Sequence, residues 1–103
     1  MKLDIDKIGN EGRVRISGSM FVEDATNVRE KLLALFDEGV ANLTFDLSGL
    51  EYIDSSGLGM LISINKRCMQ KGGKIRITEL RGVAEELFKL TRLDLVFDIV
   101  KNK

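Results

Sequence analysis

The sequence has no histidine and a single cysteine, Cys68. Without histidine, the chain cannot build a Ser/His catalytic triad or a histidine metal site from its own residues. A lone cysteine forms neither an internal disulfide nor a CxxC pair, which is typical of a protein in a reducing compartment. The sequence also lacks a phosphate-loop lysine motif and a dinucleotide fingerprint. We therefore expect a cytoplasmic protein that is not an enzyme and that holds no cofactor or metal.

Neither an excess of one charge nor a long apolar run is present. Lys and Arg together number 16, as do Asp and Glu, so the net charge is zero. A neutral chain has no overall field that would attract nucleic acid or an anionic membrane. A bilayer span needs roughly 20 apolar residues, and the charged residues within 1–12 exclude an apolar signal-peptide core there. We expect no direct contact with nucleic acid and no membrane association.

Apolar spacing in the first part of the chain predicts a hairpin followed by a helix. Alternating apolar residues at 3–8 and 14–16 flank a polar tetrapeptide bounded by Gly9 and Gly12, which predicts an antiparallel hairpin ending at Gly18. The next apolar residues recur at helical spacing, with acidic residues in the first turn and a glycine after the end. They are Ala25, Val28, Leu32, Leu35 and Phe36, with Glu23 and Asp24 before them and Gly39 behind.

The rest of the chain alternates predicted strands and helices. Strands are predicted at 43–47, 75–77 and 97–99, and helices from near Ser55 to Gly72 and over 83–90. Right-handed strand–helix–strand crossovers make the later strands mostly parallel, and alternating rather than continuous apolar strands favour one covered face. A length of 103 residues allows one domain. We expect an α/β fold over 1–103, with a mixed, mostly parallel sheet and helices mainly on one face.

The segment 52–59, Tyr-Ile-Asp-Ser-Ser-Gly-Leu-Gly, follows a predicted strand and opens the second helix. Ser55 is the predicted N-cap, since its hydroxyl can accept from a free backbone N–H one turn on. The positive end of the helix also tolerates a phosphate on that hydroxyl. Gly57 and Gly59 leave bare backbone that another protein can approach. Plain helix capping also explains these residues, and local physics alone favours that interpretation because caps of this type are common.

Residues 47–59, Leu-Ser-Gly-Leu-Glu-Tyr-Ile-Asp-Ser-Ser-Gly-Leu-Gly, resemble the signature of the STAS domain family, especially of bacterial anti-sigma factor antagonists. The predicted order of strands and helices is also that of the family. The resemblance implies that Ser55, directly after the aspartate, is phosphorylated by a partner that is both serine kinase and anti-sigma factor. Unphosphorylated, such a protein binds the anti-sigma factor and frees a sigma factor, and a separate serine phosphatase resets the phosphorylated form.

The resemblance further implies a partner-binding surface centred on this segment. Its residues are Asp54, Ser55, Ser56, Gly57, Leu58 and Gly59, with Met20 and Phe21 from the preceding loop. In the family that loop carries an acid where Phe21 stands here. This difference favours an alternative function, a constitutive STAS adaptor or scaffold subunit in another bacterial signalling or transport complex that is never phosphorylated. The sequence leaves the oligomeric state open and favours a monomer.

Other residues allow two interpretations each. Met20, Phe21 and Val22 form an apolar triplet, in which Phe21 or Val22 packs beneath the first helix as a staple or the triplet is an exposed contact patch. Cys68 lies on an apolar helix face, which predicts a buried, inert thiol. Two aspartates, Asp46 and Asp54, are too few for a metal site. Lys66, Arg67 and Lys71 complement the dipole at a helix end and need no basic binding patch to explain them.

Overall fold

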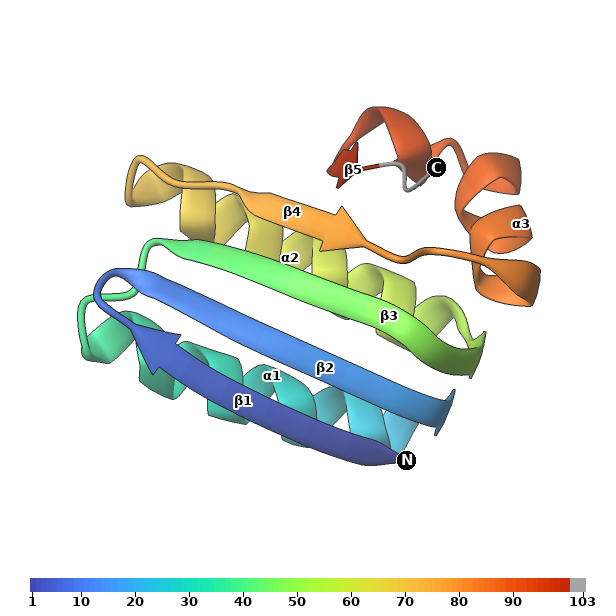
Figure 1. Cartoon of the computed structure of the whole chain (residues 1–103), viewed down its shortest axis with the longest axis horizontal. Helices are drawn as coiled ribbons and strands as arrows, with labels where there is room; N and C mark the ends of the chain where they lie inside the picture. The colour runs from blue at the N-terminus through green and yellow to red at the C-terminus, as the bar shows by residue number, and fades with distance from the viewer. Residues whose placement is uncertain (101–103) are drawn as a thin grey trace.

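Five strands form one mixed sheet in the order β1-β2-β3-β4-β5 (Figure 1). The computed structural model describes residues 1–100, so the last part of the predicted domain, 101–103, lies outside the described residues. The strands are β1 (Lys2–Ile8), β2 (Glu11–Met20), β3 (Asn42–Ile53), β4 (Ile75–Thr78) and β5 (Asp98–Val100). The helices are α1 (Val22–Asp37), α2 (Ser55–Gln70), α3 (Gly82–Leu90) and the 3-10 turn η1 (Leu93–Leu95).

The strand directions confirm the predicted topology. β1 pairs with β2 in antiparallel fashion, whereas β2–β3, β3–β4 and β4–β5 are parallel pairs. The hairpin turn is only Gly9-Asn10, and Gly9 takes a positive φ of 61° that suits a residue without a β-carbon. The predicted end of the second strand at Gly18 is wrong, because the parallel pairing with β3 continues through Met20. The α/β fold predicted from the sequence is confirmed.

Helices α1 and α2 lie side by side across one face of the sheet, as predicted (Figure 1). The buried face of α1 consists of Ala25, Val28, Leu32, Leu35 and Phe36, the residues that the helical spacing singled out. They join the inward side chains of the central strands in one core. α3 packs on β3 near the end where α2 begins. The opposite face of β1 to β4 carries charged side chains.

Strand β3 is longer than its alternating pattern predicts, because two irregularities interrupt its pairing with β2. The register shifts between Arg15 and Ser17 and again between Gly18 and Ser19. As a result, the buried residues in the second half of β3 recur every third position, at Leu47, Leu50 and Ile53. A β-bulge of this kind turns the following side chains to the other face. The strand therefore reaches the start of α2 without an intervening loop.

In the part of the chain that the structure describes, each helix is too short or too polar to cross a bilayer.

Candidate functional site

The junction between β3 and α2 places an exposed serine at the first position of a helix. Ile53 is the last residue of β3, Asp54 is the N-cap, and Ser55 is the first helical residue. A carboxylate oxygen of Asp54 accepts a hydrogen bond from the backbone N–H of Gly57 at 3.1 Å. The prediction that Ser55 is the N-cap is therefore wrong. Because β3 extends to Ile53, it is Asp54 that has the extended backbone an N-cap needs.

The shift of the cap by one residue changes what Ser55 can do. The hydroxyl of Ser55 is exposed and makes no hydrogen bond within residues 1–100. It stands at the end of α2 where free backbone N–H groups carry partial positive charge. The next residue, Ser56, is half-buried. The structure thus offers one freely accessible hydroxyl at this helix end, with its capping role taken over by Asp54.

Several predicted site residues form a buried floor beneath this junction. Met20 pairs with Ile53 in the sheet register, and both side chains are buried. Gly57 packs directly on them: a β-carbon at Gly57 would lie 2.5 Å from Ile53 Cγ1 and 3.0 Å from Met20 Sδ. The side chain of Leu58 is buried as well. The expectation that Met20 contacts a partner is corrected, because β2 continues to Met20 and turns its side chain under the helices.

An apolar patch of Phe21, Val22 and Tyr52 flanks the junction. The exposed fractions of these residues are 53%, 56% and 40%. The rings of Phe21 and Tyr52 pack against each other with 5.7 Å between their centroids. Neither Phe21 nor Val22 is buried under α1, so the staple interpretation is wrong for both. The reason is that Phe21 itself is the N-cap of α1, which puts the buried Met20 in the staple position.

Tyr52 belongs to this patch although the sequence did not single it out as a contact residue. Strict alternation from Leu47 would place Tyr52 on the open face of the sheet. The second irregularity in the β2–β3 register breaks this alternation, so the pattern does not predict where Tyr52 lies. Its register partner is Ser19, one residue before Met20. The only feature of the sequence that could have indicated a contact role for Tyr52 is its place in the 47–59 motif, two residues before the N-cap of α2.

A shallow groove of about 270 Å³ separates the first turns of α1 and α2. We call it the α1–α2 groove. It is lined by Val22, Ala25, Thr26 and Arg29 from α1 and by Ser56, Gly59, Met60 and Ser63 from α2. Gly59 is exposed, and a β-carbon there would have no heavy atom within 4 Å. The predicted accessible glycine is therefore Gly59, whereas Gly57 is a packing residue.

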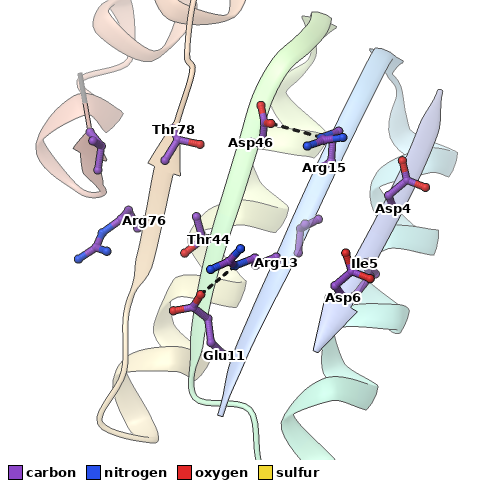
Figure 2. Close-up of a pocket in the computed structure, with 12 residues that line it drawn as sticks. Asp4, Ile5, Asp6, Glu11, Arg13, Arg15, Thr44, Asp46, Arg76 and Thr78 are labelled. Atoms are coloured by element: carbon purple, nitrogen blue, oxygen red, sulfur yellow. Dashed lines mark hydrogen bonds and ion pairs between the residues drawn. The ribbon is translucent and has the colours of Figure 1, made fainter. Parts of the chain in front are cut away.

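The open face of the sheet holds a larger hollow of about 820 Å³, and two ion pairs join charged residues that line it (Figure 2). Arg15 binds Asp46 at 3.3 Å and Arg13 binds Glu11 at 3.3 Å. Burial raises the pKa of Asp46, but the backbone N–H of Ser48 and the Arg15 guanidinium outweigh it and hold the pKa below the usual 3.8. Within residues 1–100 no three acidic or cysteine side chains gather as metal ligands. This face is a charged sheet surface in which Arg13 and Arg15 are paired with acids, while Asp4 and Asp6 make no ion pair within residues 1–100.

The remaining expectations concern α2. Cys68 is completely buried, and burial raises the pKa of its thiol to about 11, so the prediction of a buried thiol is confirmed. Lys71, the C-cap of α2, donates from Nζ to the backbone oxygen of Phe36 at 3.1 Å. Arg67 lies in the last turn, where a cation complements the helix dipole.

Comparison with known proteins gives a family, named relatives and solved structures. The profile of the family described as STAS domain matches residues 2–103. The anti-sigma-B factor antagonist of Bacillus subtilis (strain 168) is 32% identical over 99 residues, which cover 96% of this chain and 90% of the relative. The anti-sigma F factor antagonist of Paenibacillus polymyxa is 26% identical over 95 residues, covering 87% of this chain and 78% of the relative.

Two solved structures share the fold over almost the whole chain. The anti-sigma factor antagonist SpoIIAA in its unphosphorylated form has a TM-score of 0.80 at 14% identity, covering 99% of this chain and 90% of that one. The Bacillus cell fate determinant SpoIIAA in its phosphorylated form has a TM-score of 0.78 at 16% identity, covering 98% of this chain and 93% of that one. At these identities the likeness concerns the fold. The resemblance drawn from residues 47–59 is confirmed by the family match.

Proposed function

Because the chain belongs to the STAS domain family, we infer that it is an anti-sigma factor antagonist, a protein-binding switch that sequesters an anti-sigma factor and thereby frees a sigma factor. The observation that carries this function is the match along 96% of the chain to a relative named for it. The motif shared with such proteins lies at the β3–α2 junction. The protein works by binding, without catalysing a reaction, and we place it in the cytoplasm, where its lone thiol stays reduced.

Ser55 is the residue that we propose the partner kinase phosphorylates. Its hydroxyl is exposed and unbonded within residues 1–100, whereas Ser56 is half-buried against the α1–α2 groove. A kinase needs the hydroxyl oxygen free to attack a γ-phosphate, and Ser55 meets that need. The cap of α2 does not depend on it, since Asp54 holds the Gly57 N–H. A serine phosphatase would return the protein to its binding form.

Phosphate at Ser55 would prevent binding by adding charge to the centre of the contact surface. A phosphoserine carries about −1.5 to −2 charges at neutral pH. In the free monomer those charges face water and the positive end of α2. In a closed complex they lose their water, and without cationic partners this costs about 2–5 kcal/mol.

A second function is favoured by one observation. The ring of Phe21 packs on Tyr52, at the position where the resemblance to the family leads us to expect an acid. If that acid is required for phosphorylation, the chain is a constitutive adaptor or scaffold subunit that binds its partner permanently. The two functions differ in whether Ser55 is ever modified and in the partner, since the adaptor would belong to another bacterial signalling or transport complex.

The experiment that tests the function uses the anti-sigma serine kinases of the source organism, each purified and mixed with this chain. We expect one of them to bind the unmodified chain, to release its sigma factor, and to transfer phosphate from ATP. Mass spectrometry should then place the phosphate on Ser55, with Ser55→Ala losing the label and Ser56→Ala keeping it. Phosphate on Ser56 would refute the assignment, and binding without any phosphate transfer would favour the adaptor.

A further inference from the structure

The α1–α2 groove contains one charged side chain, Arg29, and no acid to balance it. Of the residues that line the groove, the polar ones besides Arg29 are hydroxyl-bearing: Thr26, Ser56 and Ser63. Arg29 is exposed and takes part in no ion pair or side-chain hydrogen bond within residues 1–100. By contrast, Arg13 and Arg15 on the open face of the sheet each bind a carboxylate. Arg29 is therefore an exposed cation in a groove that contains no carboxylate to pair with its charge.

The groove joins two other features of the same surface. Val22 belongs both to the groove and to the apolar patch that it forms with Phe21 and Tyr52. Ser56, on the other wall, is the chain neighbour of Ser55. The floor at Gly59 is open, since a β-carbon there would touch nothing within 4 Å. The apolar patch and the groove thus share Val22, and the exposed Ser55 directly precedes Ser56 of the groove wall in the chain.

Resting on the proposed function, we propose that the anti-sigma partner docks an acidic side chain into the α1–α2 groove against Arg29, and seats an apolar side chain on Phe21 and Tyr52. Charge complementarity selects the acid, because the groove offers a guanidinium and hydroxyl donors and no anionic group. The exposed rings select an apolar neighbour, because covering half-exposed aromatic surface is favourable and aromatic anchors dominate protein interfaces.

This surface also defines which anti-sigma factor the chain recognises. An arginine offers a planar fork that holds a carboxylate in two hydrogen bonds. A partner with a basic residue at that place would meet like charge and be rejected. Phe21 and Tyr52 offer no charge in the neighbouring patch, so a partner that presents a cation there gains no ion pair with them. We expect the chain to discriminate against such a partner and to bind one with an apolar residue there.

The test measures affinity by isothermal titration calorimetry with the anti-sigma kinase identified in the binding screen. Arg29→Gln should lower the affinity about tenfold and Arg29→Glu about 100-fold or more. Lys31→Glu is the matched control, since Lys31 is an exposed cation of the same helix outside the groove. It makes the same change in net charge and should alter the affinity less than threefold. The wild-type affinity should also fall with rising salt more steeply than that of Arg29→Gln.

The apolar half of the proposal has its own control. Phe21→Ala should weaken binding about tenfold, whereas Leu95→Ala, which removes a side chain that is 71% exposed in η1, should leave binding unchanged. Thermal melts of each variant verify that the fold is intact, and Arg29→Gln serves if Arg29→Glu does not fold. Equal affinities for Arg29→Glu and Lys31→Glu overturn the proposal while the function stands. If no anti-sigma kinase binds the wild type, the function itself fails and the proposal with it.

Discussion

The two glycines at the start of α2 should respond in opposite ways to the same added methyl group. Glycine inside a helix costs about 1 kcal/mol relative to alanine. At Gly59 the new β-carbon meets no atom within 4 Å, so Gly59→Ala keeps most of that gain and should raise stability by about 0.5–1 kcal/mol. For a domain of about 100 residues this corresponds to a rise in melting temperature of roughly 2–8 °C.

At Gly57 the same methyl group has no room. Its β-carbon would lie 2.5 Å from Ile53 Cγ1, 2.9 Å from Ile53 Cδ1 and 3.0 Å from Met20 Sδ. Ile53 and Met20 are fully packed residues at the ends of β3 and β2, so they cannot both move away. Overpacking a core typically costs about 1–3 kcal/mol, which exceeds the helix-propensity gain. Gly57→Ala should therefore lower the melting temperature, by up to roughly 15 °C.

A binding measurement shows whether Gly59 only affects the stability of the helix or also keeps the α1–α2 groove open for the partner. Gly59→Val should also remain folded, because valine is a slightly better helix former than glycine, yet its side chain fills the floor of the α1–α2 groove. We expect Gly59→Val to abolish binding to the anti-sigma partner in calorimetry while its thermal melt stays at or above that of the wild type. If Gly59→Ala is less stable than the wild type, the reasoning from free space is wrong. If Gly59→Val binds normally, Gly59 has only a local role.

Three further outcomes are expected. Phosphorylated Ser55 should lower partner affinity about 30-fold to several thousand-fold with little change in thermal melting or far-UV circular dichroism, and Ser55→Asp should imitate this only partly; tight binding by the phosphorylated form contradicts the mechanism. Cys68, fully buried with its pKa raised to about 11, should react with iodoacetamide at pH 8 only after unfolding in urea. Because the pKa of Asp46 is lowered in the folded protein, its contribution to stability is present above the unfolded value of about 3.8 and is lost as the pH falls through the folded value. The stability of Asp46→Asn, measured by circular dichroism, should therefore fall less steeply than that of the wild type over this acidic range.

The sequence predicts the extents of the helices well because apolar residues recur at helical spacing and glycines follow the ends of α1 and α2. The five buried residues of α1 are the ones that the helical spacing selects, and α2 ends at Gln70, two residues before Gly72, where the sequence predicts its stop. Strand β4 likewise follows its alternating pattern of Ile75 and Ile77. In these elements local pattern and tertiary packing agree, so the pattern is sufficient.

Strand β3 shows where such patterns fail. Its alternation holds through Leu47 and then gives way to burial at every third residue, because the pairing with β2 shifts register twice. A carboxylate oxygen of Asp46 accepts from the backbone N–H of Ser48 at 3.0 Å at the first shift. Gly49 is confined there too, since a β-carbon would lie 2.7 Å from Ser17 Cβ. The first of these contacts lies within β3, whereas the approach of Gly49 to Ser17 joins two strands distant in sequence, and a period along one strand encodes neither.

The error at the N-cap follows from the same cause. Asp54 and Ser55 are both good capping residues, so their identities did not decide between them. The choice depends on where β3 ends, and that is set by the partner residue Met20, with which Ile53 pairs. Once Ile53 is held in the sheet, Asp54 is the residue with extended backbone, and the helix begins at Ser55.

At the start of α2, the group that caps the helix, the Asp54 carboxylate, is distinct from the proposed phosphorylation site, the Ser55 hydroxyl. The Asp54 carboxylate satisfies the Gly57 N–H, and the packing of Gly57 on Ile53 and Met20 fixes where the helix starts. The Ser55 hydroxyl is used by neither interaction. A phosphate on it can therefore change the charge of the surface without breaking a cap or a core contact. If Ser55 were the cap, phosphorylation would alter the hydrogen bond that starts α2, and the chemical switch would also perturb folding. Separating the two by one residue lets the same monomer be equally well folded in both states, so the difference between them falls on the interface.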